Sequence, residues 1–247
     1  MRIYFCLAFG ITWGAGGLGL LAGAYRPEGA PTAARALHYL AAFGPSLAGF
    51  IMAFGVEGRA GVQRLLSRTV PTWSGLPWYV AVIVGFAAAN FVAAWVLTPE
   101  FLANLPSWDR LLYLLPLTLV TDTGPLGEEF GWRGFALPRI LERRSPLAAA
   151  LILGAIWWAW HLPTFFISTL SQSHLSIPVF LINSLSLSVI MTWLYLRTRG
   201  DLLLMILVHV MANYCGAIGV PFSAEVTAEV ACAVVIVAAG GLGRRRS

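Results

Sequence analysis

The amino-acid sequence predicts an all-α fold: one polytopic membrane helix bundle of about eight transmembrane helices over residues 1–247. Three observations support this fold class. Hydrophobic residues make up 58% of the 247 residues, charged residues only 11%, and the mean hydropathy is +0.77. A soluble domain carries about 25% charged residues, so the composition excludes an ordinary soluble protein. We expect one integral-membrane domain without a second, soluble domain.

Apolar segments of about 20 residues, the length that crosses a bilayer as a helix, follow one another along the chain. The expected spans are residues 4–24, 37–56, 78–97, 111–137, 146–167, 177–196, 202–218 and 226–242. The first is longer and richer in glycine than a signal peptide, so we expect it to persist as a helix. The fourth contains Gly124-Pro125, which predicts a break and a new helix beginning near Pro125.

The distribution of arginine predicts the orientation, and all 16 basic residues are arginines. With an even number of spans, twelve fall on the side of both termini and three on the other, and Arg133 lies inside a span. The twelve are Arg2, Arg59, Arg64, Arg68, Arg139, Arg143, Arg144, Arg197, Arg199 and Arg244 to Arg246; the three are Arg26, Arg35 and Arg110. The positive-inside rule places the richer side in the cytoplasm. We expect a plasma-membrane protein with both termini cytoplasmic, and a net charge of +5 that favours contact with the lipid bilayer and not with nucleic acid.

Two adjacent carboxylates, Glu128 and Glu129, lie inside the fourth span. A charge at the bilayer centre costs roughly 3 kcal/mol on insertion scales, so such residues indicate a function or a partner. Arg133 is four residues after Glu129 and shares its helix face, so the two can pair. Glu128 points about 100° away around the helix, which leaves its carboxylate free to face a polar cavity.

Two imidazoles and an amide, from His161, His209 and Asn213, complete the candidate site. His209 and Asn213 are four residues apart and share one face of the seventh span. Counted at roughly 1.5 Å per residue, Glu128 and these three residues lie at compatible depths of about 12–24 Å. Each also has a simpler interpretation. The Glu–Arg pair fits a structural bridge, a membrane histidine fits a hydrogen-bonded packing residue, and Asp122 fits a helix cap.

Three motifs within residues 122–213 resemble those of a known family, in type and in order. They are Glu128-Glu129-x-x-x-Arg133, Trp157-x-x-x-His161 and His209-x-x-x-Asn213. The pattern resembles the CPBP family, which comprises type II CAAX prenyl endopeptidases and the bacteriocin-processing or immunity proteins also called Abi proteins. Trp157 stands where the family usually has phenylalanine, a change of pocket shape more than of chemistry.

The resemblance implies an intramembrane endopeptidase with an eight-helix fold. Glu128 would activate water with help from His161, while His209 and Asn213 would bind the oxyanion. Glu129 and Arg133 would hold the motif in place. Peptide hydrolysis needs such an activated water and donors aimed at the tetrahedral oxygen. The implied substrate is a membrane-associated protein or peptide, such as a CAAX-type prenylated protein or a leader peptide.

The sequence leaves alternatives open for the use of a metal ion and for the class of function. Glu128, His161 and His209 could ligate zinc, since catalytic zinc takes three protein ligands. A glutamate-activated water uses the same residues without metal, and no HExxH motif is present, so the sequence slightly favours no tightly bound zinc. A proton-coupled transporter is one rival, although no repeat relates the two halves. A non-catalytic membrane scaffold or immunity protein is the other.

Overall fold

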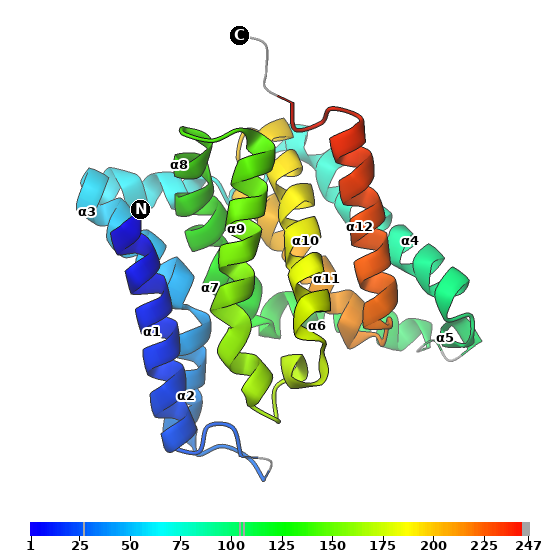
Figure 1. Ribbon diagram of the computed structural model, residues 1–247, viewed down its shortest axis with the longest axis horizontal. Helices are drawn as coiled ribbons and strands as arrows, with labels where there is room; N and C mark the ends of the chain where they lie inside the picture. The colour runs from blue at the N-terminus through cyan, green and yellow to red at the C-terminus, as the bar shows by residue number, and fades with distance from the viewer. Residues whose placement is uncertain (27, 104, 106, 244–247) are drawn as a thin grey trace.

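Three long helices run side by side along one face of the computed structural model (Figure 1): α9 (Pro146–His161), α10 (Ile177–Arg197) and α12 (Phe222–Ala238). Helices α4 (Leu76–Leu97) and α11 (Leu202–Ala217) lie behind them; α10 packs against α9 and α12, and α11 against α4. The structure describes residues 1–26, 28–103, 105 and 107–243, and this part of the chain contains no strand. The all-α fold class is confirmed.

A helical hairpin forms the edge of the bundle beside α9. Helix α1 (Arg2–Leu21) packs along α2 (Thr32–Ala42), and the Thr12 hydroxyl donates to the Ala41 carbonyl at 2.7 Å. A bend of 59° then separates α2 from α3 (Gly44–Ser67). Pro45 lacks a backbone N–H and sits in the first turn of α3, where proline is tolerated because that N–H has no helical partner. The span expected at 37–56 is therefore two helices and not one.

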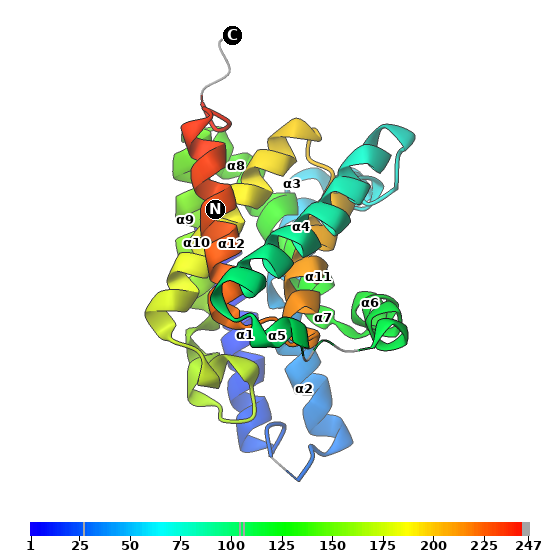
Figure 2. The same cartoon turned by 90° about the vertical axis from the view of Figure 1, so that its right-hand side faces the viewer.

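The span expected at 111–137 is divided at Asp122, as Gly124-Pro125 predicts. Helix α6 (Trp108–Thr121) ends there and lies on the outside of the bundle (Figure 2), where the Tyr214 hydroxyl of α11 donates to the Leu111 carbonyl at 2.9 Å. Asp122 is extended, and its side chain caps α7 (Thr123–Glu129) by accepting from the Gly124 N–H at 3.0 Å. The chain continues as a π-helical segment, Phe130–Ala136, and then as α8 (Leu137–Leu141). π-Helical turns are rare and frequently occur at functional sites.

Short helices complete the described part of the chain. Helix α5 (Glu100–Ala103) follows α4, and single 3₁₀ turns occur at Trp73–Gly75, Leu162–Phe166 and Ser171–His174.

Glycine allows α7 and the π-helical segment to pack directly onto α2 and α3. A Cβ atom on Gly127 would collide with the Ala42 carbonyl oxygen, and one on Gly131 with the Pro45 carbonyl oxygen. The Ser46 hydroxyl donates to the Leu126 carbonyl at 2.8 Å across the same interface. Close backbone approach thus places the carboxylate-bearing turn in the centre of the molecule.

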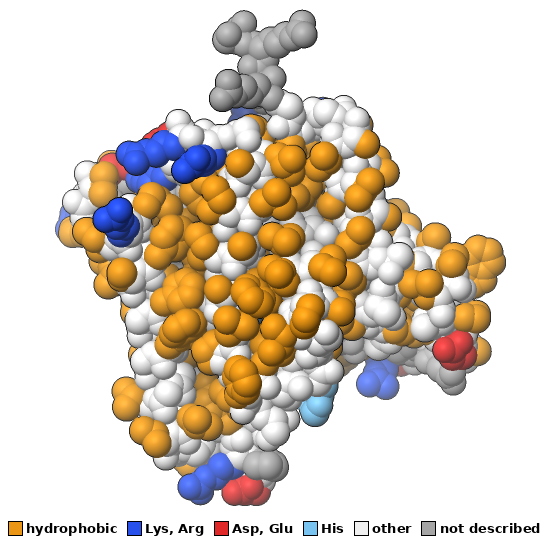
Figure 3. Space-filling model, in the orientation of Figure 1, with side chains coloured by type: hydrophobic (Ala, Val, Ile, Leu, Met, Phe, Trp, Pro, Cys, Tyr) orange, Lys and Arg blue, Asp and Glu red, His pale blue; other side chains and the backbone are white. Residues whose placement is uncertain are grey.

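The lengths and composition of the helices support a polytopic membrane protein. Four candidate spans stand alone, Arg2–Leu21, Trp73–Leu97, Pro146–Phe166 and Ile177–Arg197. The bent pair of α2 and α3 makes a fifth, and α11 is a shorter apolar helix of 16 residues. Hydrophobic side chains cover the face between the two ends of the bundle (Figure 3). The count of eight spans stays a prediction.

Charged side chains gather toward the two ends of the bundle (Figure 3). The C-terminal part of α3, the α8–α9 turn and the α10–α11 turn lie at the end where α12 finishes, and the α1–α2 connection lies at the other (Figure 1). The described arginines of the richer group belong to the first end or to the start of α1, which matches the predicted division. Arg244 to Arg246 lie outside the described residues.

Candidate active site

Three elements bring the four predicted catalytic side chains to one cavity. Glu128 comes from α7, His161 is the last residue of α9, and His209 and Asn213 come from α11. All four line a cavity of about 620 Å³ enclosed by α7, α9, α10, α11 and α12. The four side chains predicted to have compatible depths therefore line the same cavity.

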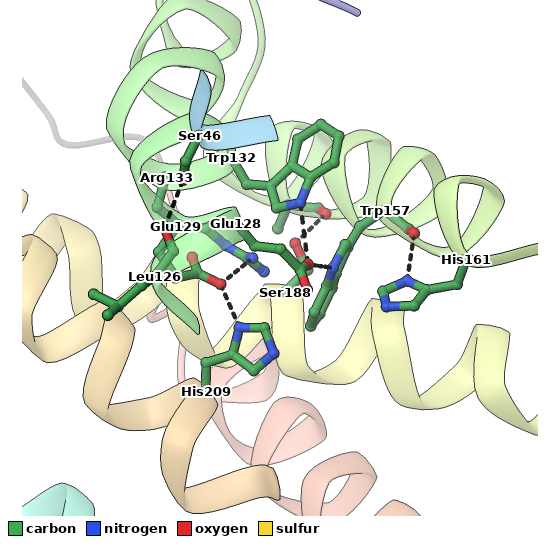
Figure 4. Close-up of polar contacts among 11 residues, drawn as sticks. Ser46, Leu126, Glu128, Glu129, Trp132, Arg133, Trp157, His161, Ser188 and His209 are labelled. Atoms are coloured by element: carbon green, nitrogen blue, oxygen red, sulfur yellow. Dashed lines mark hydrogen bonds and ion pairs between the residues drawn. The ribbon is translucent and has the colours of Figure 1, made fainter. Parts of the chain in front are cut away.

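Glu129 lies behind this cavity and links α7 to α11. Its Oε1 accepts from Arg133 Nη1 at 2.9 Å and from His209 Nδ1 at 2.7 Å (Figure 4). The Glu129 and Arg133 residues are both 0% exposed. The predicted pairing of Glu129 with Arg133 is thus present. Because a carboxylate only accepts, His209 carries a proton on Nδ1, and Nε2 is the ring nitrogen left for the cavity.

The Glu128 carboxylate is anchored through one of its two oxygens. Oε2 accepts from the indole N–H of Trp157 at 2.5 Å and from that of Trp132 at 3.3 Å (Figure 4). Oε1 accepts no hydrogen bond from any residue that the structure describes. The side chain is buried and still lines the cavity. Glu128 therefore presents one fixed oxygen to the protein and one available oxygen to a reactant.

His161 has its ring fixed at the end of α9. Its Nδ1 lies 2.9 Å from the Trp157 carbonyl oxygen, which can only accept, so Nδ1 carries the proton in this bond. In a neutral imidazole this leaves Nε2 as an acceptor. The α-helix ends at His161, and Pro163, which lacks a backbone N–H, follows within the 3₁₀ turn Leu162–Phe166. His161 thus offers a proton acceptor in the cavity that Glu128 also lines.

Asn213 is held by Asp122, which joins α11 to the start of α7. The Asn213 Nδ2 donates to Asp122 Oδ2 at 2.6 Å, while Asp122 Oδ1 caps α7. An amide nitrogen carries two N–H groups, so one remains for a ligand. Asp122 was expected only as a helix cap. It also positions Asn213, a contact between residues 91 positions apart that helical periodicity does not reveal.

Helix α12 contributes two acidic residues to the cavity lining that are absent from the predicted site residues. Glu225 and Glu229 lie on α12, and Asn183 of α10 donates to Glu229 Oε2 at 2.7 Å. The signal was present, since both glutamates lie in or beside the predicted last span and share one face at a spacing of four. Their position makes this part of the cavity lining polar.

The donor set gives a test of metal binding. Among the residues described, no three His, Cys, Asp or Glu side chains converge closely enough to hold one ion. Glu128, His161 and His209, the predicted ligand set, each keep one oxygen or nitrogen available, so it is their separation and not their hydrogen bonding that departs from a zinc site. The arrangement as it stands does not fit that three-ligand site.

Comparisons with known proteins agree with the motifs. Residues 108–215 match the family described as type II CAAX prenyl endopeptidase Rce1-like, and this segment holds all six predicted site residues. The chain is 33% identical over 92 residues to a protein named CAAX prenyl protease 2 from Methanococcus maripaludis. That alignment covers 35% of this chain and 34% of the relative, so the match spans about a third of the relative's length. Over residues 108–215, the chain is therefore similar to type II CAAX prenyl endopeptidases of the Rce1-like kind, in agreement with the resemblance that its motifs carry.

Proposed function

We propose that this protein is an intramembrane endopeptidase that hydrolyses a peptide bond of a membrane-associated protein. The observation that carries the proposal is that Glu128, His161, His209 and Asn213 all line one cavity. The name of the archaeal relative supports a CAAX-type prenylated protein as the substrate class. The catalytic roles implied by the family resemblance suit the positions of these side chains.

Hydrolysis would begin with a water molecule between Glu128 and His161. Glu128 Oε1 accepts one water proton while His161 Nε2 accepts a hydrogen bond from the other. The water oxygen attacks the scissile carbonyl carbon and forms a tetrahedral intermediate. Glu128 then passes its proton to the leaving nitrogen, and the C–N bond breaks to give a carboxylic acid and an amine. A positioned proton acceptor of this kind contributes about 100- to 10,000-fold to rate.

Oxyanion stabilisation would come from His209 and Asn213. Because Nδ1 of His209 donates to Glu129, the ring can donate from Nε2 only as an imidazolium. The Glu129 carboxylate lies beside that charge and is itself paired with Arg133. Asn213 supplies the second donor from the amide that Asp122 holds. Losing one oxyanion donor typically costs about 100- to 1000-fold in kcat.

A cleavage assay on purified protein in nanodiscs tests the proposal. The substrate is a farnesylated peptide ending in a CAAX sequence, and products are identified by mass spectrometry. We expect the wild type to release the terminal tripeptide and His161→Ala to lose this activity, because the water loses its second acceptor. His174→Ala is the matched control, since that exposed histidine lies outside the cavity. Equal cleavage by His161→Ala and wild type would contradict the assigned role.

A further inference from the structure

We propose that Trp157 is a positioning residue that fixes the orientation of the Glu128 and His161 side chains relative to each other. The inference rests on the proposed peptidase function and adds a residue to it. Trp157 lies in α9, one helical turn before His161, and is 4% exposed. Its indole nitrogen, its ring and its main-chain carbonyl each contact other residues of the site.

The two hydrogen bonds of Trp157 act on different catalytic side chains. Its indole N–H donates to Glu128 Oε2 at 2.5 Å, and its carbonyl accepts from His161 Nδ1 at 2.9 Å (Figure 4). The first bond fixes which carboxylate oxygen stays free. The second fixes the ring nitrogen that carries the proton. One residue therefore sets the two acceptors that would hold the water.

The Trp157 ring also borders the cationic part of the site. The Arg133 guanidinium lies over it with Cζ 4.5 Å from the ring centroid, within the range of a cation–π contact. The His209 ring meets it edge-on at 5.4 Å between centroids. Arg133 is thereby held between an aromatic face and Glu129, its ion-pair partner.

Substitution of Trp157 by phenylalanine distinguishes the effect of the indole hydrogen bond from the effect of ring packing. Trp157→Phe keeps an aromatic ring beside Arg133 and His209 but removes the N–H that reaches Glu128. The backbone bond to His161 is unaffected by the change of side chain. Trp158→Phe is the matched control, because the neighbouring indole donates to the Ile177 carbonyl at 3.2 Å, away from Glu128. The control reports the general cost of losing one indole N–H from α9.

The kinetic test compares these two variants with wild type on the farnesylated peptide. We expect Trp157→Phe to lower kcat by about 10- to 100-fold, the range for losing a hydrogen bond to a charged group. KM should stay near the wild-type value, because the bond orients a reacting group and does not hold the ground-state substrate. Trp158→Phe should retain wild-type kcat. A kcat unchanged in Trp157→Phe, a loss shared by Trp158→Phe, or a change confined to KM overturns the proposal.

A spectroscopic test keeps the inference independent of turnover. In protein carrying ¹⁵N-labelled indoles, Glu128→Gln should shift the N–H resonances of Trp132 and Trp157. The Trp158 resonance, identified by its loss in Trp158→Phe, should stay in place. An indole spectrum unchanged by Glu128→Gln overturns the contact on which the role of Trp157 depends. Wild-type cleavage by Glu128→Ala would instead overturn the peptidase proposal, so the two failures are distinguishable.

Discussion

At the scale of single residues, Glu129 is the side chain on which the buried charges converge. It has no exposed surface, and a single oxygen receives both Arg133 and the His209 ring. Removing one partner of a buried ion pair leaves the other charge without compensation in a medium of low dielectric. Glu128 differs, because its hydrogen bonds come from neutral indoles. We therefore expect the two glutamates to respond differently to substitution.

Arg133→Ala should destabilise the protein by about 3–5 kcal/mol, because it removes the arginine of a buried ion pair and leaves the Glu129 carboxylate with the His209 ring alone. Glu128→Gln should retain the fold, since an amide oxygen still accepts from Trp157. Thermal unfolding in nanodiscs measures both. Arg143→Ala, at an exposed arginine of the α8–α9 turn, controls for loss of positive charge. A stable Arg133→Ala together with an unfolded Glu128→Gln would reverse the assignment.

Residue contacts within one helix could be predicted from the sequence, and contacts between helices could not. The spacing of Glu129 and Arg133 predicts their pairing, and the ion pair is present. The bonds from Trp157 to Glu128 and from His209 to Glu129 join positions 29 and 80 apart. They depend on how the helices pack, which periodicity does not specify. For this reason the sequence indicates only a change of pocket shape where Trp157 replaces phenylalanine, while the structure shows an added hydrogen-bond donor.

At the scale of elements, the backbone conformation between residues 122 and 137 positions the site. The extended Asp122 turns the chain into α7, and the π-helical segment follows Glu129 directly. Gly124-Pro125 predicts the helix break. The composition of residues 130–136, in contrast, does not distinguish a π-helix from an α-helix. The bend after α2 was likewise not expected, although Gly44-Pro45 contains the residue types that permit it.

Gly131→Ala tests the close packing of the π-helical segment. The added Cβ would collide with the Pro45 carbonyl, a backbone atom that cannot move without displacing α3. Overpacking of this kind costs about 1–3 kcal/mol, so thermal stability should fall. Gly14→Ala in α1 is the matched control, because no atom lies within 4 Å of its Cβ position. Equal stability of the two variants would show that α3 and the segment are not in contact as described.

At the scale of the whole molecule, the arginine asymmetry and the course of the chain agree. The end of α12 and the α9–α10 connection lie at opposite ends of the bundle (Figure 1). We propose that the arginine-rich end faces the cytoplasm, at the plasma membrane. Reporter fusions at the C-terminus and within residues 168–176 should then report the cytoplasm and the outside, respectively. Both reporters on the same side would contradict this topology.

The central claim is that Glu128 activates the attacking water, and Glu128→Gln tests it most directly. The variant keeps the size of the side chain and a hydrogen-bond acceptor for Trp157, but its amide cannot accept the water proton. One titration and one cleavage assay on the farnesylated peptide, both in nanodiscs, separate binding from chemistry. We predict a Kd equal to that of the wild type and a kcat lower by about 100- to 10,000-fold. Wild-type turnover by Glu128→Gln would contradict the account.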